Sequence, residues 1–163
     1  AIGKGIGNGI PTAAVAARSE VFAALGSGEM SSTVGGNPVS SAAVTAILEV
    51  MDAEGIVANS RRMGELMKGR LLEMQDGLRH LGDVRGRGLV MGLELVTDRK
   101  TKEPAPDLTR ALIDRCANNG LLIGSVGIFG NVIRVAPPLT INEAEAHESL
   151  DIMAKSLREL EGA

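Results

Sequence analysis

The sequence predicts an α/β fold, and three observations support this prediction. Residues 56–78 repeat apolar side chains at helical spacing on one face. Short runs of β-branched and long apolar residues, the pattern of strands, then occur at 89–96, 121–123 and 132–135. Helical patterns at 107–117 and from Asn142 onward alternate with these runs. These predicted strands and helices all follow two glycine-rich loops, which lie within residues 1–36.

Composition and charge exclude several function classes. The chain has 163 residues, enough for a real core, and 17 basic against 20 acidic residues, so no nucleic-acid partner is expected. With two Phe and no Tyr or Trp, it lacks the aromatic platforms on which single-stranded nucleic acid stacks. No apolar run approaches the ~20 residues that cross a membrane. The one cysteine, Cys116, allows no internal disulfide, which favours a reducing compartment and a cytoplasmic protein.

The stretch 2–11 carries the strongest chemical signal. Glycines at alternate positions flank Lys4, and this density predicts unusual backbone dihedrals or a close neighbour. The spacing fits neither the P-loop nor the dinucleotide-binding fingerprint of glycines. Two interpretations stay open on the residues alone: a flexible loop with an incidental lysine, and an amine that condenses with a carbonyl group.

Two helices are expected in the first part of the chain. Ser19 is a candidate N-cap for a short helix. After the second glycine-rich loop, Asn37 as N-cap and Pro38 as the first helical residue predict a one-sided helix that reaches Met51. The small apolar run 11–17 favours neither strand nor helix, because so short a run has no decisive period.

Local signals set several boundaries in the second part. Gly77 and Gly82 are expected to end the helix that begins near residue 56, and Arg85 and Arg87 to lie in a glycine-punctuated turn. The charged, proline-bearing residues 97–106 predict a surface turn.

Two further helix starts and one strand carry specific residues. Asp107 is expected to cap a helix, and Asn142 with Glu145 three residues on is the pattern of a capping box. Arg134 interrupts an apolar strand, and strand alternation turns it to the face opposite its two neighbours.

Four motifs occur in the order, and at the separations, of one enzyme family. Together they resemble class III (subgroup II) pyridoxal-phosphate aminotransferases over essentially the whole chain, most closely the alanine–glyoxylate and 4-aminobutyrate types. The motifs are Gly3–Val15, Thr33–Pro38, Gly82–Leu89 and Ile133–Pro138. The resemblance implies an α/β fragment of the fold-type I pyridoxal-phosphate transferase architecture. Residues 1–55 would be the C-terminal end of the large cofactor-binding domain with a linking helix, and residues 56–163 the small C-terminal domain.

The resemblance also implies roles for three residues. Lys4 would form the Schiff base with pyridoxal 5'-phosphate and then move the substrate Cα proton. Thr33 would bind the phosphate of the cofactor held in the partner subunit, although an ordinary turn before an N-cap has the same pattern. Arg134 would grip a substrate carboxylate, and its alternative is a solvent-facing strand residue. No metal site is expected, and no role is assigned to Glu94, His80, His147 or Cys116.

The expected function is that of the C-terminal portion of a longer aminotransferase. The parent would exchange an amino group between an amino acid or ω-amine and a 2-oxo acid, as a homodimer. The family's ring-nitrogen acid and ring-stacking aromatic are not among these residues, so the chain alone is expected to bind the cofactor poorly and to be inactive. Two alternatives remain: a phospho-lyase or mutase with the same cofactor, and a non-catalytic dimerisation or regulatory domain with Lys4 unmodified.

Overall fold

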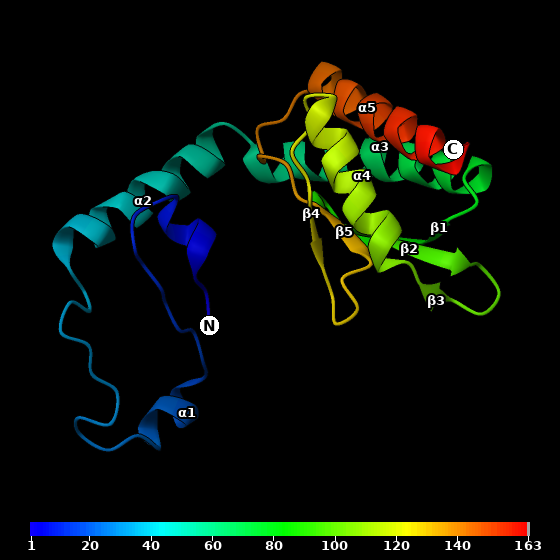
Figure 1. Cartoon of the computed structure of the whole chain (residues 1–163). Coiled ribbons are helices and arrows are strands. Elements are labelled where there is room, and N and C mark those ends of the chain that lie inside the picture. Colours follow the sequence, from blue (N-terminus) through cyan, green and yellow to red (C-terminus); the bar gives the residue numbers. More distant parts are fainter. Residues whose placement is uncertain (163) are drawn as a thin grey trace. The chain divides into compact units, whose positions relative to one another are not determined.

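The computed structural model describes residues 1–162, so the last residue of the expected second domain, Ala163, lies outside the described residues. The chain forms two compact units, Ala1–Ile56 and a second unit that begins at Val57. Figure 1 shows the element order along both units. Each unit is described by itself below.

The first unit contains three helical segments, which are joined by segments without regular secondary structure. These are η1 (Lys4–Gly7), α1 (Ser19–Ala23) and α2 (Pro38–Ala53), and η1 packs beside α2. Residues 11–17 form neither the strand nor the helix left open by their sequence. Their one regular contact is a bridge in which the backbone N–H groups of Ile2 and Ala14 each donate to the other residue's carbonyl, at 2.7 and 2.8 Å.

Two helix starts in this unit contrast with each other. The expectation for α2 is confirmed, because the Asn37 Oδ1 accepts from the N–H of Val39 at 2.9 Å and of Ser40 at 3.2 Å. The expectation for α1 is wrong by one residue. Arg18 occupies the N-cap position without a side-chain bond, and Ser19 is already helical.

The second unit is a two-layer α/β arrangement. Its elements in chain order are α3 (Ile56–Gly77), β1 (Leu81–Arg87), β2 (Val90–Asp98), β3 (Glu103–Pro104), α4 (Pro106–Asn118), β4 (Gly124–Val126), β5 (Val132–Val135) and α5 (Glu143–Glu161). The strands pair antiparallel in the order β1-β2-β5-β4, and β3 pairs with β2. The α/β class predicted from the sequence is therefore confirmed, with an antiparallel sheet.

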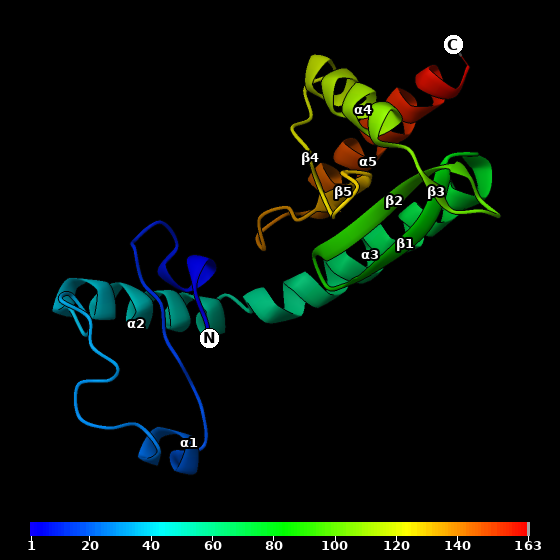
Figure 2. The ribbon, with the colours of Figure 1, turned by 60° about the horizontal axis from the view of Figure 1, so that its bottom comes forward.

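One face of this sheet packs on the helices and forms the core. The inward residues of β2, Met91, Leu93 and Leu95, are at most 2 % exposed, while Gly92 and Glu94 between them are partly open. They share one apolar cluster with Met63, Met67 and Leu71 of α3, Leu112 and Cys116 of α4, and Leu150, Met153 and Leu157 of α5. The other face of the sheet carries no covering helix from this unit (Figure 2).

Several helix predictions in this unit are confirmed. The helix α3 ends at Gly77 and buries the apolar face expected for it. The capping box of α5 is complete, since Asn142 Oδ1 accepts from the Glu145 N–H and the Glu145 carboxylate accepts from the Asn142 N–H, both at 3.0 Å. Cys116 is fully buried, as expected of a core residue, and burial raises the pKa of its thiol.

The expected glycine turn at Arg85 and Arg87 is wrong, because both lie in strand β1. The glycines there serve close approach between strands. A Cβ on Gly82 would meet the Val96 side chain at 2.6 Å, and a Cβ on Gly86 would meet Met91 Cα at 2.6 Å. The real turn is one step later, at Gly88, whose φ of +53° is left-handed.

Three other boundaries differ from expectation. Residues 121–123 are not a strand. β5 ends at Val135, and continuing the β4–β5 register would bring Leu121 opposite Pro137, which has no N–H to donate. Pro106 begins α4 and so moves the N-cap from Asp107 to Ala105. The stretch 97–106 is only partly a turn, because β2 runs to Asp98 and β3 follows.

Candidate functional site

Lys4 lies in a closed loop at the start of the first unit. The mutual backbone bonds of Ile2 and Ala14 hold the base of this loop, and bonds from Asn8 N–H to Gly5 and from Ile10 N–H to Gly7 order its interior. The Lys4 side chain is exposed. The loop therefore presents one amine on a backbone that is ordered rather than loose.

The backbone of Lys4 is itself unusual. Its φ is +53°, a left-handed conformation that costs a non-glycine residue about 1 kcal/mol. Asn8 at +42° and Gly9 at +103° continue the irregular path. The expectation of unusual dihedrals in this stretch is thus confirmed, although one of them falls on the lysine rather than on its neighbours. Strain at a residue with reactive chemistry is a reason to suspect function there.

A hollow of about 520 Å³ opens beside the amine. It is lined by Lys4, Gly5 and residues 8–12, and a Cβ added at Gly5 or Gly9 would meet no atom within 4 Å. Thr12 contributes a buried hydroxyl that finds no hydrogen-bond partner among the described residues. A buried polar atom without a partner is costly, so Thr12 Oγ1 needs a partner that the described residues do not supply. An exposed amine beside free space of this size suits a planar aldehyde such as pyridoxal 5'-phosphate.

Thr33 lies in the turn that leads into α2. It is exposed, and the turn is closed by bonds from Gly35 N–H to the Ser32 carbonyl and from Asn37 N–H to the Val34 carbonyl, both at 3.2 Å. Within residues 1–162 no hydrogen bond joins Thr33 to Lys4. The structure therefore places these two residues in one unit without a hydrogen bond between them.

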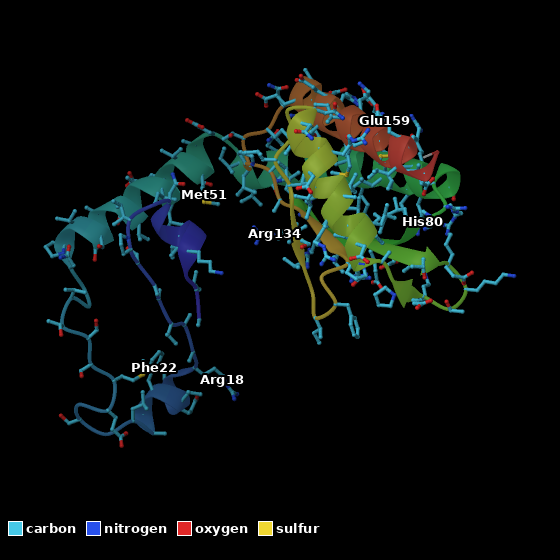
Figure 3. The ribbon with its side chains drawn as sticks, viewed as in Figure 1. Arg18, Phe22, Met51, His80, Arg134 and Glu159 are labelled. Carbon is cyan, nitrogen blue, oxygen red and sulfur yellow. The ribbon has the colours of Figure 1, made fainter. Side chains whose placement is uncertain are left out.

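Arg134 belongs to the second unit, at the third position of β5. Its neighbours Ile133 and Val135 face the core, while Arg134 is on the uncovered face of the sheet, as alternation predicts (Figure 3). Among the described residues its guanidinium makes no recorded ion pair or side-chain hydrogen bond. Its side chain is exposed, and an exposed guanidinium without an ion partner suits a small carboxylate. Arg134 also borders a hollow of about 300 Å³, but Ser149 and Met153 of α5 line that hollow from the helix layer.

The same face carries an ion cluster that sequence reasoning did not assign. The Arg85 guanidinium donates to Asp83 Oδ2 and to Glu94 Oε2, both at 2.6 Å, and these bonds raise its pKa. The signal was present as charges at every second position, Asp83, Arg85 and Arg87, which is strand rather than turn spacing.

The described part of the chain contains neither a metal-binding cluster nor a helix that could cross a membrane. In the described part of the chain, no three His, Cys, Asp or Glu side chains stand close enough to hold a metal ion. None of the described helices combines the length and apolarity needed to cross a membrane.

Comparison with known proteins decides the family. The model of the class-III aminotransferases matches residues 1–157. The chain belongs to the class-III aminotransferase family. It is 40% identical over 157 residues to an alanine–glyoxylate aminotransferase 2 homolog of Arabidopsis thaliana, covering 96% of this chain and 33% of the relative. It is also 40% identical over 154 residues to a 4-aminobutyrate aminotransferase of Mycobacterium leprae, covering 94% and 34%.

A solved structure gives the same family by shape. A Bacillus anthracis aminotransferase superposes on the chain with a TM-score of 0.79 at 32% identity, over 87% of this chain and 34% of that one. The chain thus spans about a third of the length of the class-III proteins it matches.

The family contains more than one reaction. The chain is 36% identical to an alanine/serine racemase of Pyrococcus horikoshii and 38% identical to an ethanolamine-phosphate phospho-lyase homolog of Caenorhabditis elegans, each over 96% of its length. These relatives are covered to 32% and 34%. Family members use pyridoxal phosphate, and membership by itself leaves the reaction of this chain open.

Proposed function

We propose that this chain is part of a longer pyridoxal-phosphate-dependent aminotransferase, which moves an amino group between an amino acid or ω-amine and a 2-oxo acid. The observation that carries the proposal is Lys4, an exposed amine held with left-handed backbone at the mouth of a hollow that fits the cofactor ring. The most similar relatives include two named aminotransferases, which agrees with this reaction class.

Lys4 would hold the cofactor covalently and serve as the proton carrier. The bound cofactor supplies an electron sink that acidifies the substrate Cα–H. Lys4 Nζ would accept that proton as a general base and return it as an acid. Gly3 and Gly5 place no side chain beside Lys4, and a Cβ added at either position would meet no other part of the chain within 4 Å.

Thr33 would contribute to phosphate binding at the start of α2. Its hydroxyl lies in a tight turn just before the capped N-terminus of a 16-residue helix, where N–H groups and the helix dipole favour an anion. By analogy with the family, the phosphate is that of a partner subunit, so the parent would be a homodimer.

Arg134 would orient the substrate through its carboxylate. Two parallel N–H···O bonds from the guanidinium fix the carboxylate in one plane, which limits the orientations of the reacting carbon. A carboxylate ligand also accounts for an arginine that lacks an ion partner among residues 1–162 while the neighbouring Arg85 has two.

The domain assignment remains part of the proposal. We infer that residues 1–55 end the large cofactor-binding domain and that residues 56–163 form the small C-terminal domain. The first unit buries almost nothing of its own, which suits the end of a larger domain. The cytoplasmic location likewise stays a prediction from the single cysteine.

The deciding experiment is covalent trapping in the complete polypeptide that carries this chain. Pyridoxal phosphate is added, the imine is reduced with borohydride, and the modified peptide is mapped. We expect the adduct on Lys4, together with a visible imine band that Lys4→Ala abolishes. Lys100→Ala is the matched control, since Lys100 is an exposed turn lysine far along the sequence. An adduct on another lysine, or an imine band that survives Lys4→Ala, would refute the proposal.

The same preparation separates the rival reactions. An aminotransferase converts a 2-oxo acid into the matching amino acid with stoichiometric loss of the donor amine. A racemase inverts alanine or serine without an acceptor, and a phospho-lyase releases phosphate from ethanolamine phosphate. The racemase and phospho-lyase relatives make both assays necessary. With the 163-residue chain alone we expect no stable adduct and no turnover.

A further inference from the structure

The uncovered face of the sheet brings Arg134 into one charged row with Arg85. Gly92 of β2 stands opposite Arg85 on one side and opposite Arg134 on the other. Since side chains alternate with a period of two, these residues share a face with Glu94, which is two positions beyond Gly92. Gly92 therefore separates two guanidinium-bearing positions without adding a side chain of its own.

Arg85 is held firmly on its side of this row. Its guanidinium is 2.6 Å from both the Asp83 and the Glu94 carboxylates, and the Glu94 side chain is only 27% exposed. Its stem runs beside Gly92, where an added Cβ would come 4.0 Å from Arg85 Cγ and 3.2 Å from the Val132 side chain. Because Gly92 has no side chain, space remains beside it for the Arg85 side chain to extend to Glu94.

Glu94 stands within diagonal reach of Arg134. It pairs with Val132 across the β2–β5 ladder, two residues before Arg134, and diagonal neighbours of long side chains in antiparallel sheets interact. Asp83, Arg85 and Glu94 together carry two negative charges and one positive charge. Removal of Arg85 would leave two uncompensated carboxylates beside a guanidinium that has no recorded partner within residues 1–162.

We propose that Arg85 is a positioning residue that keeps Glu94 away from Arg134. Its role is to bind Glu94 and Asp83 so that Arg134 stays free for the carboxylate of the substrate. This inference rests on the proposed function of Arg134 as the carboxylate ligand. It predicts that Glu94, once released, competes with the substrate for Arg134, because both present the same chemical group to the same guanidinium.

The test is steady-state kinetics of the complete polypeptide at low ionic strength, where surface charge effects are least screened. Pyruvate is the carboxylate-bearing acceptor and butanal the acceptor without a carboxylate. We expect Arg85→Ala to raise KM for pyruvate about tenfold, with kcat and the KM for butanal within twofold of the parent values. The double variant Arg85→Ala/Glu94→Gln should return KM for pyruvate to within twofold.

Arg87→Ala is the matched control. Arg87 lies two positions further on the same strand and face, opposite Val90, and no ion pair is recorded for it in the described part of the chain. It removes the same charge without releasing a carboxylate, so KM for pyruvate should change less than twofold. An equal rise in Arg87→Ala would show a general charge effect and overturn the proposal.

Other outcomes also decide the question. A raised KM that Glu94→Gln does not rescue, or that applies equally to butanal, would show a merely structural role and overturn the proposal. If Arg85→Ala does not fold, Arg85→Gln takes its place, because it removes the charge but keeps a polar side chain; it should also raise KM for pyruvate, and no rise overturns the proposal. Arg134→Ala separates the two proposals. If it raises KM for pyruvate and Arg85→Ala does not, only the positioning role fails; if it has no effect, the carboxylate role of Arg134 fails first.

Discussion

The two compact units of this chain differ most in what they bury. Between Ala1 and Gly55 the only buried residue is Gly7, and large apolar side chains such as Phe22 on α1 are exposed (Figure 3). From Ile56 onward the helices and the sheet share one continuous apolar cluster. The second unit therefore contains the core that stabilises it, whereas the first unit has apolar side chains without a core.

The two units show that an apolar sequence pattern does not by itself lead to burial of the apolar side chains. The helices α2 and α3 both carry a one-sided apolar stripe, yet α2 has no buried residue while α3 has Met63 and Leu71 at 0% exposure. An apolar stripe indicates which face of a helix favours burial, but that face is buried only where another surface packs against it. This contrast between the two units motivates four predictions.

Separation of the two units should have the largest effect. Residues 57–163 expressed alone should fold with a cooperative urea transition, because the core lies almost entirely within them. Residues 1–56 alone should show no cooperative transition, because they bury too little apolar surface to offset conformational entropy. Circular dichroism during urea titration measures both. A sharp transition in residues 1–56 would break the comparison.

Truncation of one leucine in each unit should follow. Leu150 is 0% exposed, so Leu150→Ala should lower the free energy of unfolding by about 3 kcal/mol. Leu48 is 55% exposed, so Leu48→Ala in the same chain should change it by less than about 0.5 kcal/mol. Equilibrium urea unfolding gives both values. Equal losses at the two sites would mean that the first unit has a core after all.

Two glycines of α3 sharpen the comparison within the second unit. A Cβ on Gly64 would lie 2.6 Å from Gly88 Cα, so Gly64→Ala should destabilise the chain by about 2 kcal/mol. Gly69 has nothing within 4 Å of its added Cβ, so Gly69→Ala should stabilise by about 0.5 kcal/mol through helix propensity. Thermal unfolding of both variants tests whether the contact of α3 with the β1–β2 turn is as close as the structure shows.

The helix caps should give the smallest effect. Asn142→Ala removes half of a complete capping box and should reduce the stability of the second unit by about 1 kcal/mol. Asn37→Ala removes a cap that accepts two N–H groups of α2. It should leave the global unfolding transition unchanged, because α2 contributes no buried residue to the core that unfolds in that transition. A loss of similar size in both variants, measured by urea unfolding, would indicate that the two units unfold together.

Much of the fold was predictable from local sequence. Asn37 and Asn142 were assigned correctly as caps because capping depends on one side chain and the next three N–H groups. The boundary at residues 121–123 was not predictable in the same way, because it depends on where the partner strand β5 ends, at Val135, two residues before Pro137. The prediction of a turn at Arg85 and Arg87 was wrong for a similar reason. Gly82 and Gly86 are glycines because β2 packs too closely for a side chain at these positions, and not because the chain turns there.

The candidate site divides along the same line. The motifs around Lys4, Thr33 and Arg134 are contiguous, so the sequence alone identified the family, which the comparisons confirm. The roles of these three residues stay predictions until they are tested. The ion cluster of Asp83, Arg85 and Glu94 was not predicted. It joins strands β1 and β2, and the register that places Asp83 opposite Glu94 cannot be derived from the sequence.

The sequence by itself determined the α/β class, most of the helices, the caps of α2 and α5, and the glycine-rich loop that presents Lys4. These features depend on propensities and bonds between residues a few positions apart. The tertiary structure alone decided which apolar stripes are buried, which glycines allow close approach and which charges meet across the sheet. Those features depend on strand register and on partner surfaces, since a contact forms only when distant segments are brought together.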